Sequence, residues 1–183
     1  MQKQQTTSII IAVLLIVIAA ISRVVMYPHN FSPVIGMAIF AGAVIKDRKL
    51  AFILPIAAMF LSDTMFEVSN IALGFWGWGQ LIGYGILALI TLFAFTMKKI
   101  NVINVAGYSI ASSLIFFFLS NSSVWLFDKT FYAQNFSGWM NCLAAGIPFL
   151  KNGLAADLTY SAVLFGTYYL LQKYAFSKKI VGQ

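Results

Sequence analysis

Six runs of apolar residues, almost free of charged side chains, take up most of this chain of 183 residues. Hydrophobic residues make up 61% of the sequence and charged residues 9%. A soluble domain has about 45–50% apolar and about 25% charged residues. So few polar side chains cannot cover a water-exposed surface. The composition therefore excludes an ordinary soluble domain, a disordered chain and a nucleic-acid-binding protein, and it predicts an integral membrane protein.

We expect an all-α, polytopic fold, because a backbone in lipid must satisfy its hydrogen bonds internally. An apolar stretch at 139–150, which ends near Pro148, is too short to cross and is predicted to be a re-entrant or capping segment. No long linker or repeat divides the chain, so residues 1–183 are expected to form a single membrane domain. The six predicted transmembrane helices cover approximately residues 8–26, 32–45, 50–66, 78–97, 102–119 and 152–172.

The charged residues predict how these helices are oriented. With a cytoplasmic N-terminus, the inner side holds nine cations and one acid, Asp47, while the outer side holds three cations and four acids. This is the pattern of the positive-inside rule, and it places both termini in the cytoplasm. The inner cations are Lys3, Lys46, Arg48, Lys49, Lys98, Lys99, Lys173, Lys178 and Lys179.

With this orientation, polar residues from all six segments gather at the outer ends of the helices. A charge within the membrane is expensive unless it faces a partner or a wet cavity. Two interpretations follow. The first is structural: ion pairs, with Arg23 and Lys151 opposite Asp63 and Asp157, or side chains that snorkel to the interface. The second is a ligand-binding cavity open to the outside. The tryptophans form an aromatic belt or a lid over a flat ligand. The candidate binding residues are Arg23, His29, Asn30, Asp63, Asn121, Trp125, Trp139, Lys151, Asn152 and Asp157.

Spacing refines this picture at three places. Asp63 and Glu67 share a helical face if their helix continues that far, and they then need a cation to offset their repulsion. The serines at 109, 112 and 113 form a mildly polar stripe that favours helix packing over a site. Asp157 shares a face with Tyr160 and Ser161, so a neighbouring hydroxyl on its own helix is expected to hold its carboxylate.

The sequence lacks the residue patterns of common catalytic centres. It contains one histidine, His29, and one cysteine, Cys142, and no set of ligands has the spacing of a metal site. It also has no Walker A loop and no GxSxG nucleophile elbow. We therefore expect neither an enzyme nor a resident metal or cofactor.

Two stretches carry a family resemblance. The first runs from Arg23 to Asp63 and contains YPHNFSPVIGMAIFAGA and LPIAAMFLSD; the second joins Asn121–Trp125 to SGWMNCLAAGIPFLKNGLAADLTYSAVLFG at 137–166. The NFSP, LSD and PFxxNxxxxD patterns resemble a family of small bacterial membrane proteins described as transporters, whose activity is uncharacterised. That family is in turn similar to the S components, the substrate-binding subunits, of energy-coupling-factor vitamin transporters.

The resemblance implies a six-helix S-component-like bundle in the bacterial cytoplasmic membrane, with a vitamin site near the outer face. The family's patterned residues coincide with nine of the candidates, all except Trp139. The sequence departs from S components in its first helix, where Ala12 is followed four residues later by Ile16 in place of the second alanine of an AxxxA docking motif. A different partner, or a solitary carrier, therefore remains open.

The leading hypothesis is a binding subunit that captures a vitamin-like molecule, with cobalamin as the analogy, from the outer side. The resemblance implies a transmembrane coupling subunit and ATPase subunits as partners. One alternative is a structural subunit of a larger membrane complex, in which the polar cluster is internal ion pairing. Another is an ion-coupled carrier in which Asp63 or Asp157 cycles a proton.

Overall fold

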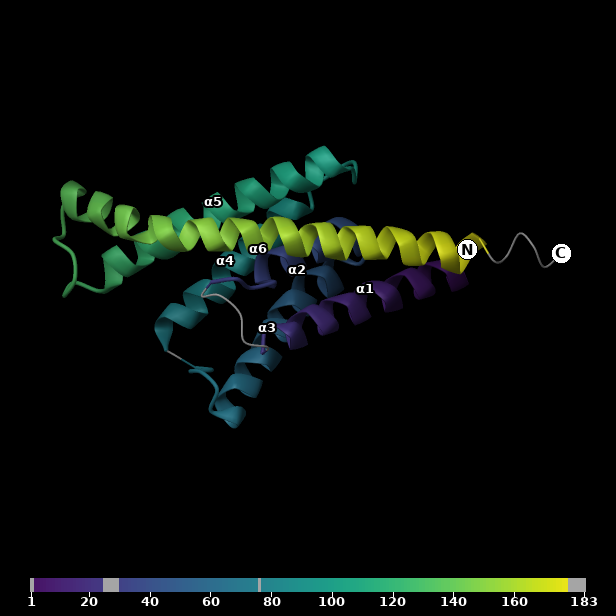
Figure 1. Ribbon diagram of the computed structural model, residues 1–183, viewed down its shortest axis with the longest axis horizontal. Coiled ribbons are helices and arrows are strands. Elements are labelled where there is room, and N and C mark those ends of the chain that lie inside the picture. The colour runs from purple at the N-terminus through teal and green to yellow at the C-terminus, as the bar shows by residue number, and fades with distance from the viewer. Residues whose placement is uncertain (1, 25–29, 76, 178–183) are drawn as a thin grey trace.

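The computed structural model describes residues 2–24, 30–75 and 77–177, and within these ranges the chain forms six helices and no strands (Figure 1). The all-α prediction is therefore confirmed. Two helices, α3 (Arg48–Ser69) and α5 (Val102–Phe127), are long and apolar enough to cross a membrane. The helices are α1 (Gln2–Ser22), α2 (Val34–Val44), α3 (Arg48–Ser69), α4 (Trp78–Ala94), α5 (Val102–Phe127) and α6 (Phe136–Ser177).

Successive helices alternate in direction. At one end of the molecule the beginning of α1 lies beside the end of α6, where Gln172 Nε2 donates to Ser8 Oγ at 2.8 Å (Figure 1). The beginning of α3 likewise meets the end of α4, where the Arg48 guanidinium lies 4.2 Å from the centre of the Phe95 ring. At the other end, α1 ends beside α6, where the hydroxyls of Ser22 and Tyr160 are 3.1 Å apart. The beginning of α1 and the end of α6 thus lie at the same end of the bundle.

The core of the fold is α2, which contacts the other five helices. Nine of its eleven residues are buried. Its sequence is apolar on every side, which is typical of a helix surrounded by protein. Close approach needs a small residue at Gly42, because a Cβ there would lie 2.7 Å from both the Ala94 Cβ and the Thr91 carbonyl oxygen.

The outward faces of the surrounding helices are apolar. On α1, the buried side carries Ala12, Ile16, Ala19 and Ala20, while large aliphatic side chains on the opposite side are about half exposed. A helix that is apolar on both its buried and its exposed sides is expected in a lipid environment. The exposed aliphatic residues on α1 are Ile10, Leu14, Ile18 and Ile21.

Several helices have different bounds from those predicted. α1 lies earlier in the chain than the predicted 8–26, and α3 extends three residues beyond residue 66. The largest extension is in α5, which continues from residue 119 to Phe127. Polar residues end the apolar run there without ending the helix, because Asn121 Nδ2 and Ser123 Oγ donate to backbone carbonyls one turn earlier.

The prediction of a separate re-entrant or capping segment at 139–150 is wrong. Residues 136–177 form one continuous helix of 42 residues that passes through Pro148. Proline removes one backbone hydrogen bond, but packing against α5 holds the turns around it. Gly146 makes this packing close, because a Cβ there would lie 2.5 Å from Asn121 Oδ1. At about 1.5 Å per residue the helix is about 63 Å long, roughly twice the thickness of a bilayer core.

Candidate functional site

One polar cluster joins the end of α1 to α3 and α4. We call it the Arg23 cluster; its members are Arg23, Ser62, Asp63, Gln80 and Tyr84. Arg23 Nη1 forms an ion pair with Asp63 Oδ1 and donates to Ser62 Oγ at 2.7 Å. The second carboxylate oxygen, Asp63 Oδ2, accepts from Gln80 Nε2 and from the Tyr84 hydroxyl, both at 2.7 Å.

The Arg23 cluster is closed and its charges are balanced. Asp63 is 1% exposed, and both of its oxygens accept from donors: Arg23 at the end of α1, and Gln80 and Tyr84 of α4. The Arg23 guanidinium also lies 5.1 Å from the centre of the Phe66 ring, a distance suited to a cation–π contact. For these two residues the structure therefore favours the interpretation as a structural ion pair over that of an open cavity.

A loop after α3 completes this cluster. Because α3 extends to Ser69, Asp63 and Glu67 lie on one face as the spacing predicted, and Arg23 supplies the cation that offsets Asp63. Glu67 Oε2 accepts from the backbone N–H groups of Gly74 and Phe75 at 3.1 and 3.3 Å. Gly74 is needed here, because a Cβ would lie 2.1 Å from the Asp63 carbonyl oxygen.

A second polar cluster lies between α5 and α6. We call it the Asp157 cluster; its members are Ser109, Ser113, Asp157 and Ser161, all of which are buried. Ser113 Oγ donates to Asp157 Oδ2 at 2.5 Å, and Ser109 Oγ donates to Ser161 Oγ at 2.8 Å. The two pairs lie one turn apart on each of the two helices, so the serine stripe of α5 faces the acidic face of α6.

The hydroxyl that holds Asp157 differs from the one expected. The sequence pattern placed it on α6, at Tyr160 or Ser161, but the hydroxyl is Ser113 on α5. Tyr160 is bonded to Ser22 of α1, and Ser161 is bonded to Ser109. Residues four apart share a helical face, but nothing in such spacing indicates which neighbouring helix supplies a closer donor.

Asp157 differs from Asp63 in that no cation of the described residues pairs with it. It is 2% exposed, and among the residues that the structure describes no Lys or Arg forms an ion pair with it. Lys151, the predicted counterpart, is exposed one and a half turns earlier on α6. The Lys151–Asp157 pair is thus not formed. A buried carboxylate held by a hydroxyl alone is unfavourable for stability, and such residues in membrane proteins are commonly functional.

The predicted residues near the α5–α6 turn hold these two helices together. Trp125 Nε1 donates to the Ala133 carbonyl at 2.9 Å, and Trp139 Nε1 donates to Ser122 Oγ at 2.9 Å. Cys142 Sγ lies 3.3 Å from the Asn121 carbonyl oxygen, which it can contact as a weak donor. Both indoles are half-buried and their N–H groups are occupied. In this structure the two indoles stabilise the turn between α5 and α6.

Three of the remaining predicted residues, Asn30, Lys151 and Asn152, lie on α6 or beside it. His29 lies outside the described residues. Asn30 is exposed with φ of 62°, and its carbonyl oxygen would lie 4.0 Å from a Cβ on Gly153. The segment before α2 therefore lies against α6 beside Lys151 and Asn152, which are exposed. The Phe31 and Tyr160 rings, 5.9 Å apart, continue this contact toward Asp157.

Sequence reasoning did not select Tyr84 or assign Gln80 to the binding set. Both contact Asp63, and they lie four residues apart on α4, so they share a face of that helix. A glutamine and a tyrosine at this spacing in an otherwise apolar helix were the available signal. No group of three potential metal ligands occurs within residues 2–24, 30–75 and 77–177.

The fold and its two clusters define an all-α protein with membrane-compatible helices and polar contacts between them. The chain belongs to a family described as "Family of unknown function (DUF6580)", whose model matches residues 3–179. No curated protein and no solved structure matches the chain.

Proposed function

We propose that the protein crosses the bacterial cytoplasmic membrane six times and binds a vitamin-like small molecule from the outer side for uptake. The alternating helix directions and the apolar outward faces support the membrane placement. The short α2, about 16 Å long, is compatible with it because protein rather than lipid surrounds this helix.

Asp157 is the observation that carries the binding proposal. A carboxylate that is 2% exposed and bonded to one serine has capacity for a further donor or a positive charge. The described part of the chain supplies no such cation, whereas a ligand with an ammonium, amidinium or amide N–H group can supply one. Asn30, Lys151 and Asn152, which are exposed beside the same helix, are suited to receive the ligand from outside.

Energy for uptake would come from a transmembrane coupling subunit and ATPase subunits, as the resemblance to S components implies. The face of α1 that carries Ala12 and Ile16 is fully buried in the bundle. A coupling subunit would therefore contact a different surface of this protein. Cobalamin, suggested by the same resemblance, is one member of the ligand panel to be tested.

The experiment is a screen of vitamins against the purified protein by thermal shift, followed by calorimetry of the best hit. A bound ligand raises stability by mass action. Asp157→Asn is expected to weaken binding at least tenfold, while Asp128→Asn, a matched change in the loop after α5, leaves it unchanged. Equal affinity in both variants, or no stabilising vitamin, would reject the proposed site.

A proton-coupled carrier is the second candidate, because Asp157, a buried carboxyl group with no described cation beside it, is also suited to exchange a proton. This function predicts uptake driven by a pH gradient in liposomes that hold this protein alone. Binding without uptake in these liposomes favours the subunit. If neither binding nor uptake occurs and native purification yields a stoichiometric partner without ATPase subunits, the protein is a structural subunit.

A further inference from the structure

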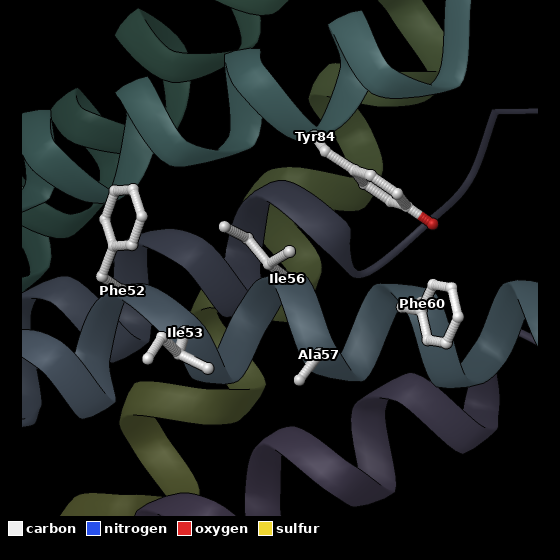
Figure 2. A pocket seen from close by; sticks show the side chains of 6 residues that line it. All are labelled: Phe52, Ile53, Ile56, Ala57, Phe60 and Tyr84. Atoms are coloured by element: carbon white, nitrogen blue, oxygen red, sulfur yellow. The ribbon is translucent and has the colours of Figure 1, made fainter. Parts of the chain in front are cut away.

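Two adjoining hollows follow the seam between α3 and α4. The first has a volume of about 290 Å³ and is lined by Phe52, Ile53, Ile56, Ala57, Phe60 and Tyr84 (Figure 2). The second, of about 320 Å³, shares Phe52 and Ile53 and adds Arg48, Lys49, Leu92 and Phe95. Because Phe52 and Ile53 line both hollows, the two lie next to each other along this seam, and we call the pair the α3–α4 groove.

The chemistry of the groove changes along its length. From Phe52 to Phe60 its walls are aliphatic and aromatic side chains, with Tyr84 at the Phe60 end (Figure 2). The Tyr84 hydroxyl donates a hydrogen bond to Asp63. At the opposite end lie two exposed cations, Arg48 and Lys49. The groove is therefore apolar for most of its length and positive at one mouth.

The two cations at this mouth are available to a ligand. Within the described residues neither Arg48 nor Lys49 forms an ion pair. The nearest acid in sequence, Asp47, is turned to the helix terminus, where its Oδ1 accepts from the backbone N–H groups of Lys49 and Leu50. The Phe95 ring, 4.2 Å from the Arg48 guanidinium, holds that group beside the groove. The N–H groups of the guanidinium can still donate hydrogen bonds to a ligand.

We infer that the α3–α4 groove binds an anionic phospholipid of the cytoplasmic leaflet, with an acyl chain along the groove and the phosphate at Arg48 and Lys49. This inference goes beyond the proposed ligand uptake and uses the orientation of the chain given above. From Arg48 to Phe60 the helix rises about 18 Å, close to half of the about 30 Å hydrocarbon core. The groove thus has the length of one leaflet, and its positive mouth lies on the side where anionic lipids concentrate.

The test compares dioleoyl phosphatidylglycerol with dioleoyl phosphatidylcholine, added to the purified full chain and counted by native mass spectrometry and thermal shift. The wild type is expected to prefer the anionic lipid by roughly tenfold or more. The double variant R48Q/K49Q should lose most of this preference. The matched variant K98Q/K99Q removes two cations near the same end that do not line the groove, and it should keep the preference.

A second pair of variants tests the acyl chain. Ala57→Trp fills the groove and should weaken binding of both lipids, whereas Val163→Trp adds the same ring to an exposed position of α6 and should have no effect. The inference is overturned if R48Q/K49Q keeps the wild-type preference, or if Ala57→Trp binds lipid normally. It is also overturned if inorganic phosphate alone gives the same stabilisation as the anionic lipid. A dimer that covers the groove and persists when lipid is added would overturn it as well. None of these outcomes depends on vitamin binding, so the two proposals fail separately.

Discussion

Two carboxylates, those of Asp63 and Asp157, are buried at helix contacts, and the groups around them differ. Asp63 is surrounded by an arginine, a glutamine and a tyrosine from two other helices, and its charge is balanced. Asp157 is equally buried, but a single serine holds it and no described cation lies beside it. The comparison separates a carboxylate that joins helices from one that is left with unused binding capacity.

The difference teaches that burial alone does not identify a binding residue. Removing one member of a balanced buried pair leaves the other charge without compensation and is strongly destabilising. Removing the charge of an uncompensated carboxylate relieves a desolvation penalty instead. Variants of the two clusters should therefore differ in the size and even the direction of their effect on stability.

The largest expected effect is that of Arg23→Ala, which leaves Asp63 buried without its cation. The free energy of unfolding should fall by about 3–5 kcal/mol, measured by denaturant titration in mixed micelles. As a control, the double variant Arg23→Ala/Asp63→Asn should recover a substantial part of the loss, because the remaining amide carries no charge. Equal instability of the single and double variants would show that the ion pair does not hold α1 to α3.

Gly74→Ala should have the next largest effect, because the new methyl group would meet the Asp63 carbonyl oxygen and displace the loop that Glu67 holds. We expect a loss of about 3 kcal/mol, measured in the same titration. Gly83→Ala is the matched control, since a Cβ there meets nothing within 4 Å. A Gly74→Ala protein as stable as this control would mean that the loop does not support the Arg23 cluster.

Ser113→Ala and Ser112→Ala form a matched pair on adjacent residues of α5. Ser113→Ala removes the hydrogen bond to a buried carboxylate and should reduce stability by about 2 kcal/mol. Ser112 Oγ is buried and has no hydrogen-bond partner in the described residues, so its removal should change stability by less than about 0.5 kcal/mol. Thermal unfolding of the two variants side by side tests this, and the reverse order would contradict the assignment.

Asp157→Asn should have the smallest effect on stability, a change of less than about 1 kcal/mol, because an amide oxygen can still accept from Ser113 without burying a charge. The equivalent change Asp63→Asn should reduce stability by about 2 kcal/mol, since it weakens a charge-assisted bond to Arg23. Both values come from unfolding titrations without ligand. Similar losses in the two variants would remove the distinction between the clusters.

Much of the fold followed from hydropathy and charge. The apolar runs predicted the helical class and placed α2 to within two residues at each end. The continuous α6 could not be predicted in this way, because a hydropathy window detects the polar turn at Lys151 and Asn152 but not the packing of Gly146 against α5. Local composition does not reveal a tertiary contact that stabilises a helix through a proline.

The sequence predicted which residues belong to the candidate site better than it predicted which of them form pairs. Opposite charges at the same depth indicated that Arg23 and Asp63 could pair, and they do. The same argument offered Lys151 as a counterpart for Asp157, yet that lysine is exposed and the carboxylate contacts Ser113. Depth along a helix can be read from a sequence, but the rotation of each helix about its axis is set by packing among all six described helices.

The central position of α2 has a consequence for biosynthesis. Ribosomes make this helix second, but its Phe40 ring packs against the rings of Phe165 and Tyr168, which are made more than 120 residues later. Until the last helix is made, this short apolar segment lacks part of its surroundings. The core around α2 is therefore complete only once α6 has been made, and a chain truncated before residue 165 lacks both of these ring contacts.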